Sequence, residues 1–370
     1  SSVSNMRLME EVKKQESGFY PSVDAFLEKT KSIEPRATSS ESNRIGVRLN
    51  QNLFAGFRDK YSSESASFKQ QANQFQGKYD SAKLRFELKN LFDASLFYQK
   101  AIVFAEKTVA RRAENLRIVN LRYEGGRENR SSVLKTEASL LMAEVDLKDY
   151  VSSLELTKNN LAKLTGLMLS DLNKIEGSLA NRQDPSQFSL QDHPLVQQSN
   201  FMKQSTGVDV GIARSQWLPK VDAAADFYRR GADQKIDSQN YLTVSLNLSV
   251  PLFEPAQSHN YKIAVFSATD AELNAAKVEN DIEIELRTSE SEFQSAQLSL
   301  TAAAKSLEAS KLQAEVYRQR YTLGMISFQD WDAAETDFIK SEKDLLGAEH
   351  QLSKSISKVN LARGLTIEES

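Results

Sequence analysis

The sequence has no cysteine among its 370 residues. This absence excludes disulfide bonds, thiolate metal sites and cysteine nucleophiles. No apolar run reaches about 18 residues, so we expect no membrane-spanning helix. The 47 basic and 50 acidic residues nearly balance, which argues against a DNA or RNA partner, because a nucleic-acid surface must neutralise phosphates.

Motifs for catalysis are missing as well. The three histidines, His193, His259 and His350, lie far apart, and none belongs to an HExxH motif. The sequence has no GxxxxGK[ST] loop and no GxGxxG loop, and most carboxylates recur at the spacing of a solvated helix face. We therefore expect no enzyme activity, no cofactor and no metal site. Charges from Arg7 to Lys14 also indicate that no secretory signal begins at Ser1.

Proline is rare, and its positions leave two long segments uninterrupted. None of the seven prolines lies between Pro35 and Pro185 or after Pro255, so nothing breaks a helix there. Apolar residues in these segments recur at spacings of three and four, which predicts helices that pack at coiled-coil angles. The longest would extend about 100 Å at roughly 1.5 Å per residue. We expect helices over residues 57–121, 129–167, 194–215, 257–321 and 328–362.

Four shorter segments alternate between apolar and polar residues, as strands with one apolar face do. A soluble sheet on a core would show the same alternation, but the chain offers little else apolar to cover it. Strands of about ten residues with this pattern are typical of transmembrane barrels. We expect strands over 19–30, 44–55, 218–230 and 240–252, with polar loops over 31–43 and 231–240. The predicted lipid-facing residues of the last strand are Leu242, Val244, Leu246, Leu248 and Val250, and the predicted water-facing ones are Thr243, Ser245, Asn247 and Ser249.

The two halves of the chain repeat each other at an offset of 198 or 199 residues. The segment Gly18 to Ala25 aligns with Gln216 to Ala223. This period is too long for a solenoid unit, so it indicates a duplicated structural half. We expect two repeats, residues 1–192 and 193–370, each with a strand hairpin, a long helix, a tight turn and a returning helix. Residues 168–192 would connect them.

Several short motifs recur at matching places in both halves. They are Tyr20-Pro21 and Leu218-Pro219 at strand entries, Leu53-Phe54-Ala55-Gly56 and Val250-Pro251-Leu252-Phe253 at strand exits, and Arg122-Tyr123-x-x-Gly126 and Arg320-Tyr321-x-x-Gly324 at helix turns. In their order, spacing and duplication, these motifs resemble the outer membrane efflux protein (TolC-like) family. The resemblance covers nearly the whole chain.

The resemblance implies an α+β membrane protein that forms a homotrimer. Each chain would give four strands to one twelve-stranded transmembrane β-barrel, and long antiparallel coiled-coil helices would form an α-helical barrel in the periplasm. Such a protein is the exit duct, in the Gram-negative outer membrane, of a tripartite efflux or type I secretion system. Its partners would be a periplasmic adaptor (membrane fusion protein), an inner-membrane RND or ABC transporter and outer-membrane lipid. The alternative is a periplasmic coiled-coil adaptor or scaffold, which would carry one helical hairpin rather than two.

The resemblance also assigns roles at the two helix turns. An apolar cluster around the turn glycine docks the adaptor, and Leu323-Gly324-Met325-Ile326-Ser327 matches it, whereas the charged first turn, Gly125-Gly126-Arg127, does not. An acidic pore constriction would lie at Asp330. Tyr321 would tether neighbouring helices through the position of Ser132, where a hydroxyl replaces the usual acidic residue.

One departure from the family concerns the start of the chain. The second half begins about 25 residues before Pro219, at His193, whereas only 20 residues precede Pro21. The helix that usually opens the first half is therefore expected to be missing or truncated.

Overall fold

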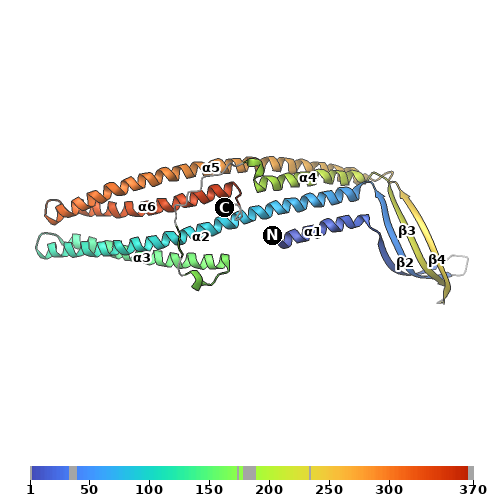
Figure 1. Ribbon diagram of the computed structural model, residues 1–370, viewed down its shortest axis with the longest axis horizontal. Helices are drawn as coiled ribbons and strands as arrows, with labels where there is room; N and C mark the ends of the chain where they lie inside the picture. The colour runs from blue at the N-terminus through green and yellow to red at the C-terminus, as the bar shows by residue number, and fades with distance from the viewer. Residues whose placement is uncertain (1, 33–39, 173–174, 178–188, 233–234, 366–370) are drawn as a thin grey trace. The chain divides into compact units, whose positions relative to one another are not determined.

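The computed structural model describes residues 2–32, 40–172, 175–177, 189–232 and 235–365 (Figure 1). An order of one helix, two strands and two long helices occurs twice along the chain. The elements are α1 (Ser2–Glu16), η1 (Ser17–Phe19), β1 (Ser22–Ser32), β2 (Ser40–Ala55), α2 (Arg58–Glu124), α3 (Arg130–Thr165), η2 (Leu169–Leu172), η3 (Leu190–Asp192), α4 (Pro194–Ser215), β3 (Lys220–Ala232), β4 (Lys235–Ser249), α5 (Pro255–Thr322) and α6 (Phe328–Ala362).

The chain divides into two compact units, and the two longest helices, α2 and α5, contribute to both. The first unit contains residues 1–78 and 191–281, and the second contains residues 79–190 and 282–370. The first unit therefore holds all four strands, and the second holds the turns at which α2 leads into α3 and α5 into α6. In the described part of the chain, no helix is apolar over enough of its length to cross a membrane.

The four strands form one antiparallel sheet in the order β1-β2-β3-β4. The outer strands, β1 and β4, each have a neighbour on one side only. Because the strands are antiparallel, the junctions with α1, α2, α4 and α5 lie at one end of the sheet (Figure 1). The strand ends at Ser32, Ser40, Ala232 and Lys235, which we call the hairpin-loop end, lie at the other. The sheet therefore has two open edges and two chemically different ends.

The cross-strand register gathers the apolar residues on one face of the sheet. Val23 pairs with Leu49, Leu49 with Ala225 and Ala225 with Val244. Further rows on this face join Ala25, Val47, Phe227 and Leu242, and then Leu27, Ile45, Arg229 and Asn240. The β4 residues of this face, from Leu242 to Leu248, are 65–73% exposed. An exposed apolar surface of this extent marks a site of contact with a membrane or with another protein.

The opposite face is polar and held together by ion pairs. Arg48 donates to Asp226 at 2.7 Å across β2 and β3 and also lies over the Phe26 ring. Arg44 pairs with Glu28 at 2.6 Å. The alternation predicted for β4 therefore extends over all four strands. Because successive side chains of a strand point to opposite sides, this alternation gives the sheet one apolar face and one polar face.

Inside the first unit, α2 packs along α4 through aromatic and hydroxyl contacts. Phe68 and Phe75 of α2 both stack on Phe201 of α4. Nearby, the buried Ser65 and Ser205 hydroxyls lie 3.0 Å apart. These contacts place the helices that lead into and out of the sheet.

The structure corrects four sequence-based expectations about boundaries. The helix expected to be missing or truncated is not missing: α1 precedes the first strand and covers 15 residues, where α4 covers 22. Phe19 belongs to the 3-10 turn η1 rather than to β1. The strands extend into the predicted polar loops, since polar residues also pair across them, as Lys31 pairs with Glu41. Val250 lies one residue beyond β4. Most of residues 173–188, in the predicted connection, lie outside the described residues.

Candidate functional site

The second unit presents two turns of the same construction, one in each half of the sequence. At the end of α2, Gly126 has φ of 69° and donates to the carbonyl of Tyr123 at 2.9 Å. At the end of α5, Gly324 has φ of 76° and donates to the carbonyl of Tyr321 at 2.9 Å. The next residue donates to the carbonyl five residues earlier in both turns, which completes a Schellman motif. Glycine is needed there because other residues rarely adopt positive φ.

The returning helices begin with matching caps that carry different side chains. The Asn129 side chain accepts from the backbone N–H of Ser132 at 2.9 Å, and that of Ser327 accepts from the N–H of Asp330 at 3.2 Å. Ser327 also donates to the Asp330 carboxylate at 2.7 Å, so the second cap is reciprocal. Ser132 is buried, whereas Asp330 is exposed. Asp330 thus lies in the first turn of α6, bound to the Ser327 cap, and still offers its carboxylate to water.

An apolar cluster joins the two helical hairpins behind the turns. The rings of Tyr321 and Trp331 stack 4.4 Å apart and nearly parallel. Phe328 meets both rings edge-on, and Val119 and Val133 from the first hairpin complete the buried group. Aromatic pairs of this kind contribute about 0.5–1.5 kcal/mol beyond their buried area. The cluster therefore holds the two turns together within the chain.

Tyr321 is bound to an acidic residue, but not through the predicted position. Its hydroxyl donates to Oε2 of Glu128 at 2.8 Å, and Ser132 donates to Oε1 of the same carboxylate at 2.9 Å. The predicted direct pair of Tyr321 with Ser132 is therefore wrong, because Glu128 lies between the two hydroxyls and accepts from both. Arg122 closes the group by donating to the Tyr321 carbonyl at 2.7 Å and by lying over its ring.

The environment of Glu128 favours its charged form. Partial burial alone would raise the pKa of Glu128, but hydrogen bonds from Tyr321, the Asn129 backbone and Ser132, with the nearby Arg122 charge, hold that pKa below its usual value. Burial first, and then the Glu128 carboxylate, raise the pKa of the Tyr321 hydroxyl. At neutral pH this bond therefore joins a neutral phenol to a carboxylate, which makes it stronger than a neutral pair.

Further along the same helices, buried ion pairs join α2 to α6. Glu335 is 0% exposed and accepts from Arg111 at 2.6 Å and from Asn115 at 3.4 Å. Arg112 lies 3.5 Å from Asp332, and Lys135 of α3 reaches the other oxygen of that carboxylate at 2.8 Å. Burial lowers the pKa of the Arg112 guanidinium, with both carboxylates opposing that effect. Removing one partner of such a pair leaves a buried charge and is strongly destabilising.

The two turns present different surfaces. Leu323 and Met325 on the second turn are each 69% exposed, whereas Ile326 packs against the apolar cluster. Gly125, Gly126 and Arg127 on the first turn are exposed but offer no apolar side chain. The second turn is therefore the more apolar of the two.

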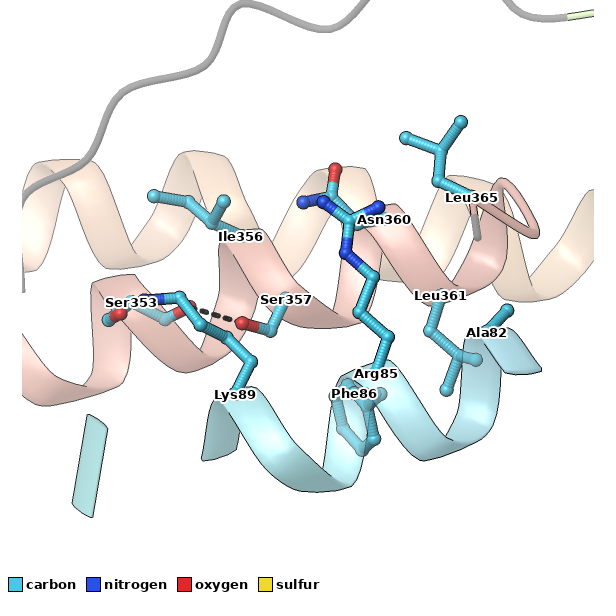
Figure 2. A pocket seen from close by; sticks show the side chains of 10 residues that line it. All are labelled: Ala82, Arg85, Phe86, Lys89, Ser353, Ile356, Ser357, Asn360, Leu361 and Leu365. Carbon is cyan, nitrogen blue, oxygen red and sulfur yellow. Dashed lines mark hydrogen bonds between the residues drawn. The ribbon is translucent and has the colours of Figure 1, made fainter. Parts of the chain in front are cut away.

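A polar cavity of about 190 Å³ lies between α2 and α6 in the second unit. Figure 2 shows Arg85 and Lys89 extending from α2 toward Ser353, Ser357 and Asn360 of α6. Lys89 is neutralised by Asp93 at 2.7 Å, and Ser353 donates to the same carboxylate. Lys89, Asp93 and Ser353 therefore satisfy one another, and the Ser357 hydroxyl donates to the Ser353 carbonyl. Within the described ranges, no group of three acidic, histidine or cysteine side chains could hold a metal ion.

Sequence reasoning missed two features of this region. Glu128 lies in an irregular turn, where no periodicity marks a residue for contact. The buried pair of Arg111 and Glu335 had a weak signal, because Glu335 follows Trp331 by four residues and precedes Phe338 by three, on the same helix face.

Comparisons with known proteins give a consistent result. The sequence model of the family described as "Outer membrane efflux protein" matches residues 4–167 and 186–364. Outer membrane efflux protein BepC of Brucella suis is 19% identical over 95% of this chain and 79% of its own length. A membrane protein from Pseudomonas aeruginosa has a TM-score of 0.91 with 14% identity, covering 100% of this chain and 87% of its own. The outer membrane protein VceC from Vibrio cholerae has a TM-score of 0.88 with 14% identity, covering 98% and 91%.

Replacing Tyr321 by Phe should loosen both turns. The substitution removes a hydrogen bond to a carboxylate, worth about 1.5–3 kcal/mol, while keeping the stacked ring. Hydrogen–deuterium exchange of residues 122–133 and 317–331 should become faster at neutral pH. The matched control is Tyr123→Phe, because Tyr123 occupies the equivalent place in the first half and is exposed.

The effect should depend on pH in a defined direction. Because the folded pKa of Glu128 is lowered, the stability from its ionised form is full above the ordinary value of about 4.3 and is lost as the pH falls through the lowered value. The difference between wild type and Tyr321→Phe should therefore be largest at neutral pH and shrink in acid. A difference in exchange between wild type and Tyr321→Phe that stays constant from neutral to acid pH would contradict the hydrogen bond from Tyr321 to Glu128.

Proposed function

This chain belongs to the outer membrane efflux protein family, and from that premise we propose that three copies form the exit duct of a tripartite efflux or type I secretion system. The protein is an outer-membrane channel, with its long helices in the periplasm. In the proposed assembly it receives substrates from a periplasmic adaptor and an inner-membrane RND or ABC transporter. It then releases them to the exterior.

The observation that carries this proposal is the open four-stranded sheet with one apolar face. Lipid supplies no hydrogen bonds, so a sheet in a membrane must close on itself. Four strands are too few to close alone, but three copies joined from β1 to β4 supply twelve. The apolar rows then face lipid, and the ion pairs of Arg48 with Asp226 and Arg44 with Glu28 face the lumen.

The helices support a second, periplasmic part of the duct. We infer two structural repeats, residues 1–192 and 193–370, because the element order is the same in both. Three copies would place six helical hairpins around one axis as an α-helical barrel. A periplasmic adaptor would carry one such hairpin, whereas this chain has two and joins their strands in one sheet.

We assign the turns of the second unit to the entrance of the duct. Leu323, Gly324 and Met325, with Ile326 and Ser327 behind them, form the proposed main docking site for an adaptor. The more polar turn of Gly125, Gly126 and Arg127 forms the second site. Asp330, exposed beside the Gly324 turn, is the proposed constriction, where three carboxylates would attract cations.

Spin labels at positions 244 and 245 test the proposed lipid face. In the reconstituted protein, a label at Val244 should be accessible to a lipid-soluble relaxing agent, and a label at Ser245 to a water-soluble one. The two positions are adjacent in β4 and on opposite faces, so each serves as the control for the other. Equal accessibility at both would exclude a barrel wall in this register.

Photo-crosslinkers at Met325 and Arg127 test the unequal docking sites. With the cognate adaptor present, the label at 325 should crosslink more strongly than the label at 127, because only the second turn exposes large apolar side chains. A label at Leu298, exposed in the middle of α5, measures the background. A strong crosslink at 127 alone would reverse the assignment.

Replacing Asp330 by Ala tests the proposed constriction. In planar bilayers the channel should be cation-selective, and Asp330→Ala should reduce both this selectivity and block by multivalent cations. Asp330→Asn keeps the size of the side chain and an acceptor for the Ser327 hydroxyl but has no charge, so it should behave like Asp330→Ala if charge is what matters. Selectivity that is unchanged in both variants would place the constriction elsewhere.

A further inference from the structure

The apolar face of the sheet changes character at its hairpin-loop end. Beyond the row of Ala25, Val47, Phe227 and Leu242, basic residues replace apolar ones. Arg229 of β3 occupies the row of Leu27 and Ile45, and Lys29 and Lys31 of β1 follow in the next rows. We call Lys29, Lys31 and Arg229 the basic rim.

The two lysines of the basic rim share one acidic partner. Glu41 lies 3.3 Å from the Lys29 ammonium and 3.6 Å from that of Lys31. The lysine side chains remain 59% and 54% exposed. Among the side chains of this face that the structure describes, these three cations and the Glu41 carboxylate leave an excess of two positive charges in each chain.

Arg229 has capacity for a further anionic ligand. Its Nε donates to Asn240 at 2.9 Å, and this is its one hydrogen bond among the residues that the structure describes. The residue is exposed, so the two terminal guanidinium nitrogens can reach a ligand beside the sheet. A guanidinium is well matched to phosphate because its donors form a planar fork.

The opposite end of the same face has no counterpart to this rim. There the rows contain Gln51 with Ala223 and Leu246, and Val221 with Leu248. The charge on the apolar face is thus confined to the end that carries the hairpin loops. In the outer-membrane orientation proposed above, that end is the outward-facing one.

The basic residues on the other face have different surroundings. Arg230 lies over the Tyr241 ring, and Arg44 lies over the Tyr228 ring and pairs with Glu28. Arg230 and Arg229 are neighbours in the chain and project to opposite faces, as their different partners demonstrate. Arg230 is therefore a matched comparison for Arg229.

We propose that the basic rim binds the phosphate groups of phosphorylated lipids in the outward-facing leaflet. The inference rests on the proposed function, because only a sheet that faces lipid brings these residues beside headgroups. Acyl chains would cover the apolar rows below, which sets the headgroup phosphates level with Lys29, Lys31 and Arg229. The lipid, rather than free phosphate, is the ligand because the apolar rows contribute to holding it.

The test uses the full-length protein in a neutral detergent, titrated with diphosphoryl lipid A and followed by native mass spectrometry. The apparent dissociation constant should rise about fivefold for each basic side chain lost, and roughly 100-fold in the Lys29→Gln, Lys31→Gln, Arg229→Gln triple variant. The control Arg230→Gln should bind like the wild type. Glu41→Gln should bind more tightly, because it removes the carboxylate that pairs with Lys29 and Lys31.

Further measurements distinguish a failure of this inference from a failure of the proposed function. Sodium phosphate should compete poorly; if it binds as well as the lipid, the ligand is free phosphate and the proposal is wrong. Equal binding by the triple variant and the wild type, or equal losses in the triple variant and Arg230→Gln, would also overturn it. If the protein inserts into neutral phosphatidylcholine vesicles but shows no preference for lipid A, the proposed lipid binding by the basic rim is wrong and the exit duct is unaffected. Failure to insert into any vesicle overturns the exit duct as well.

Discussion

Backbone N–H and C=O groups inside a bilayer must find hydrogen-bond partners in the protein, because lipid offers none. In this chain β2 and β3 are paired on both sides, whereas β1 and β4 are each paired on one side. In the proposed duct, other copies of the chain complete the sheet, so that neither open edge is left to lipid. The proposed lipid face, polar lumen, number of hairpins around the axis and entrance at the turns all depend on that completion.

The strand faces and the long helices could be predicted because their signals are local. Apolar residues at every second position specify a face whatever the strand pairs with, and the predicted helix bounds lie within three residues of the observed ones. Helix α1 was missed because it is short and six of its 15 residues are charged. The loop ends of the strands were missed because polar pairs such as Lys31 with Glu41 continue the ladder without an apolar pattern.

The candidate site was less predictable because duplicated backbones carry different side chains. Both turns have a glycine with positive φ and a capping side chain at the equivalent position. However, Ser132 lies where the second half has Asp330, and Val133 lies where it has Trp331. Family resemblance placed the acceptor for Tyr321 at position 132, whereas the carboxylate comes from Glu128, four residues earlier. A residue in an irregular turn can supply the same contact from another position, which no periodicity reveals.

Closure of the sheet by three copies can be measured directly, since the chain has no cysteine of its own. Asp24→Cys on β1 would be combined in turn with Thr243→Cys, Ser245→Cys and Asn247→Cys on β4, which all project to the polar face. After oxidation in the membrane, at least one pair should give a covalent trimer and no larger species, and each single variant should give none. Only monomers, or a ladder extending beyond three copies, would contradict a barrel closed from β1 to β4.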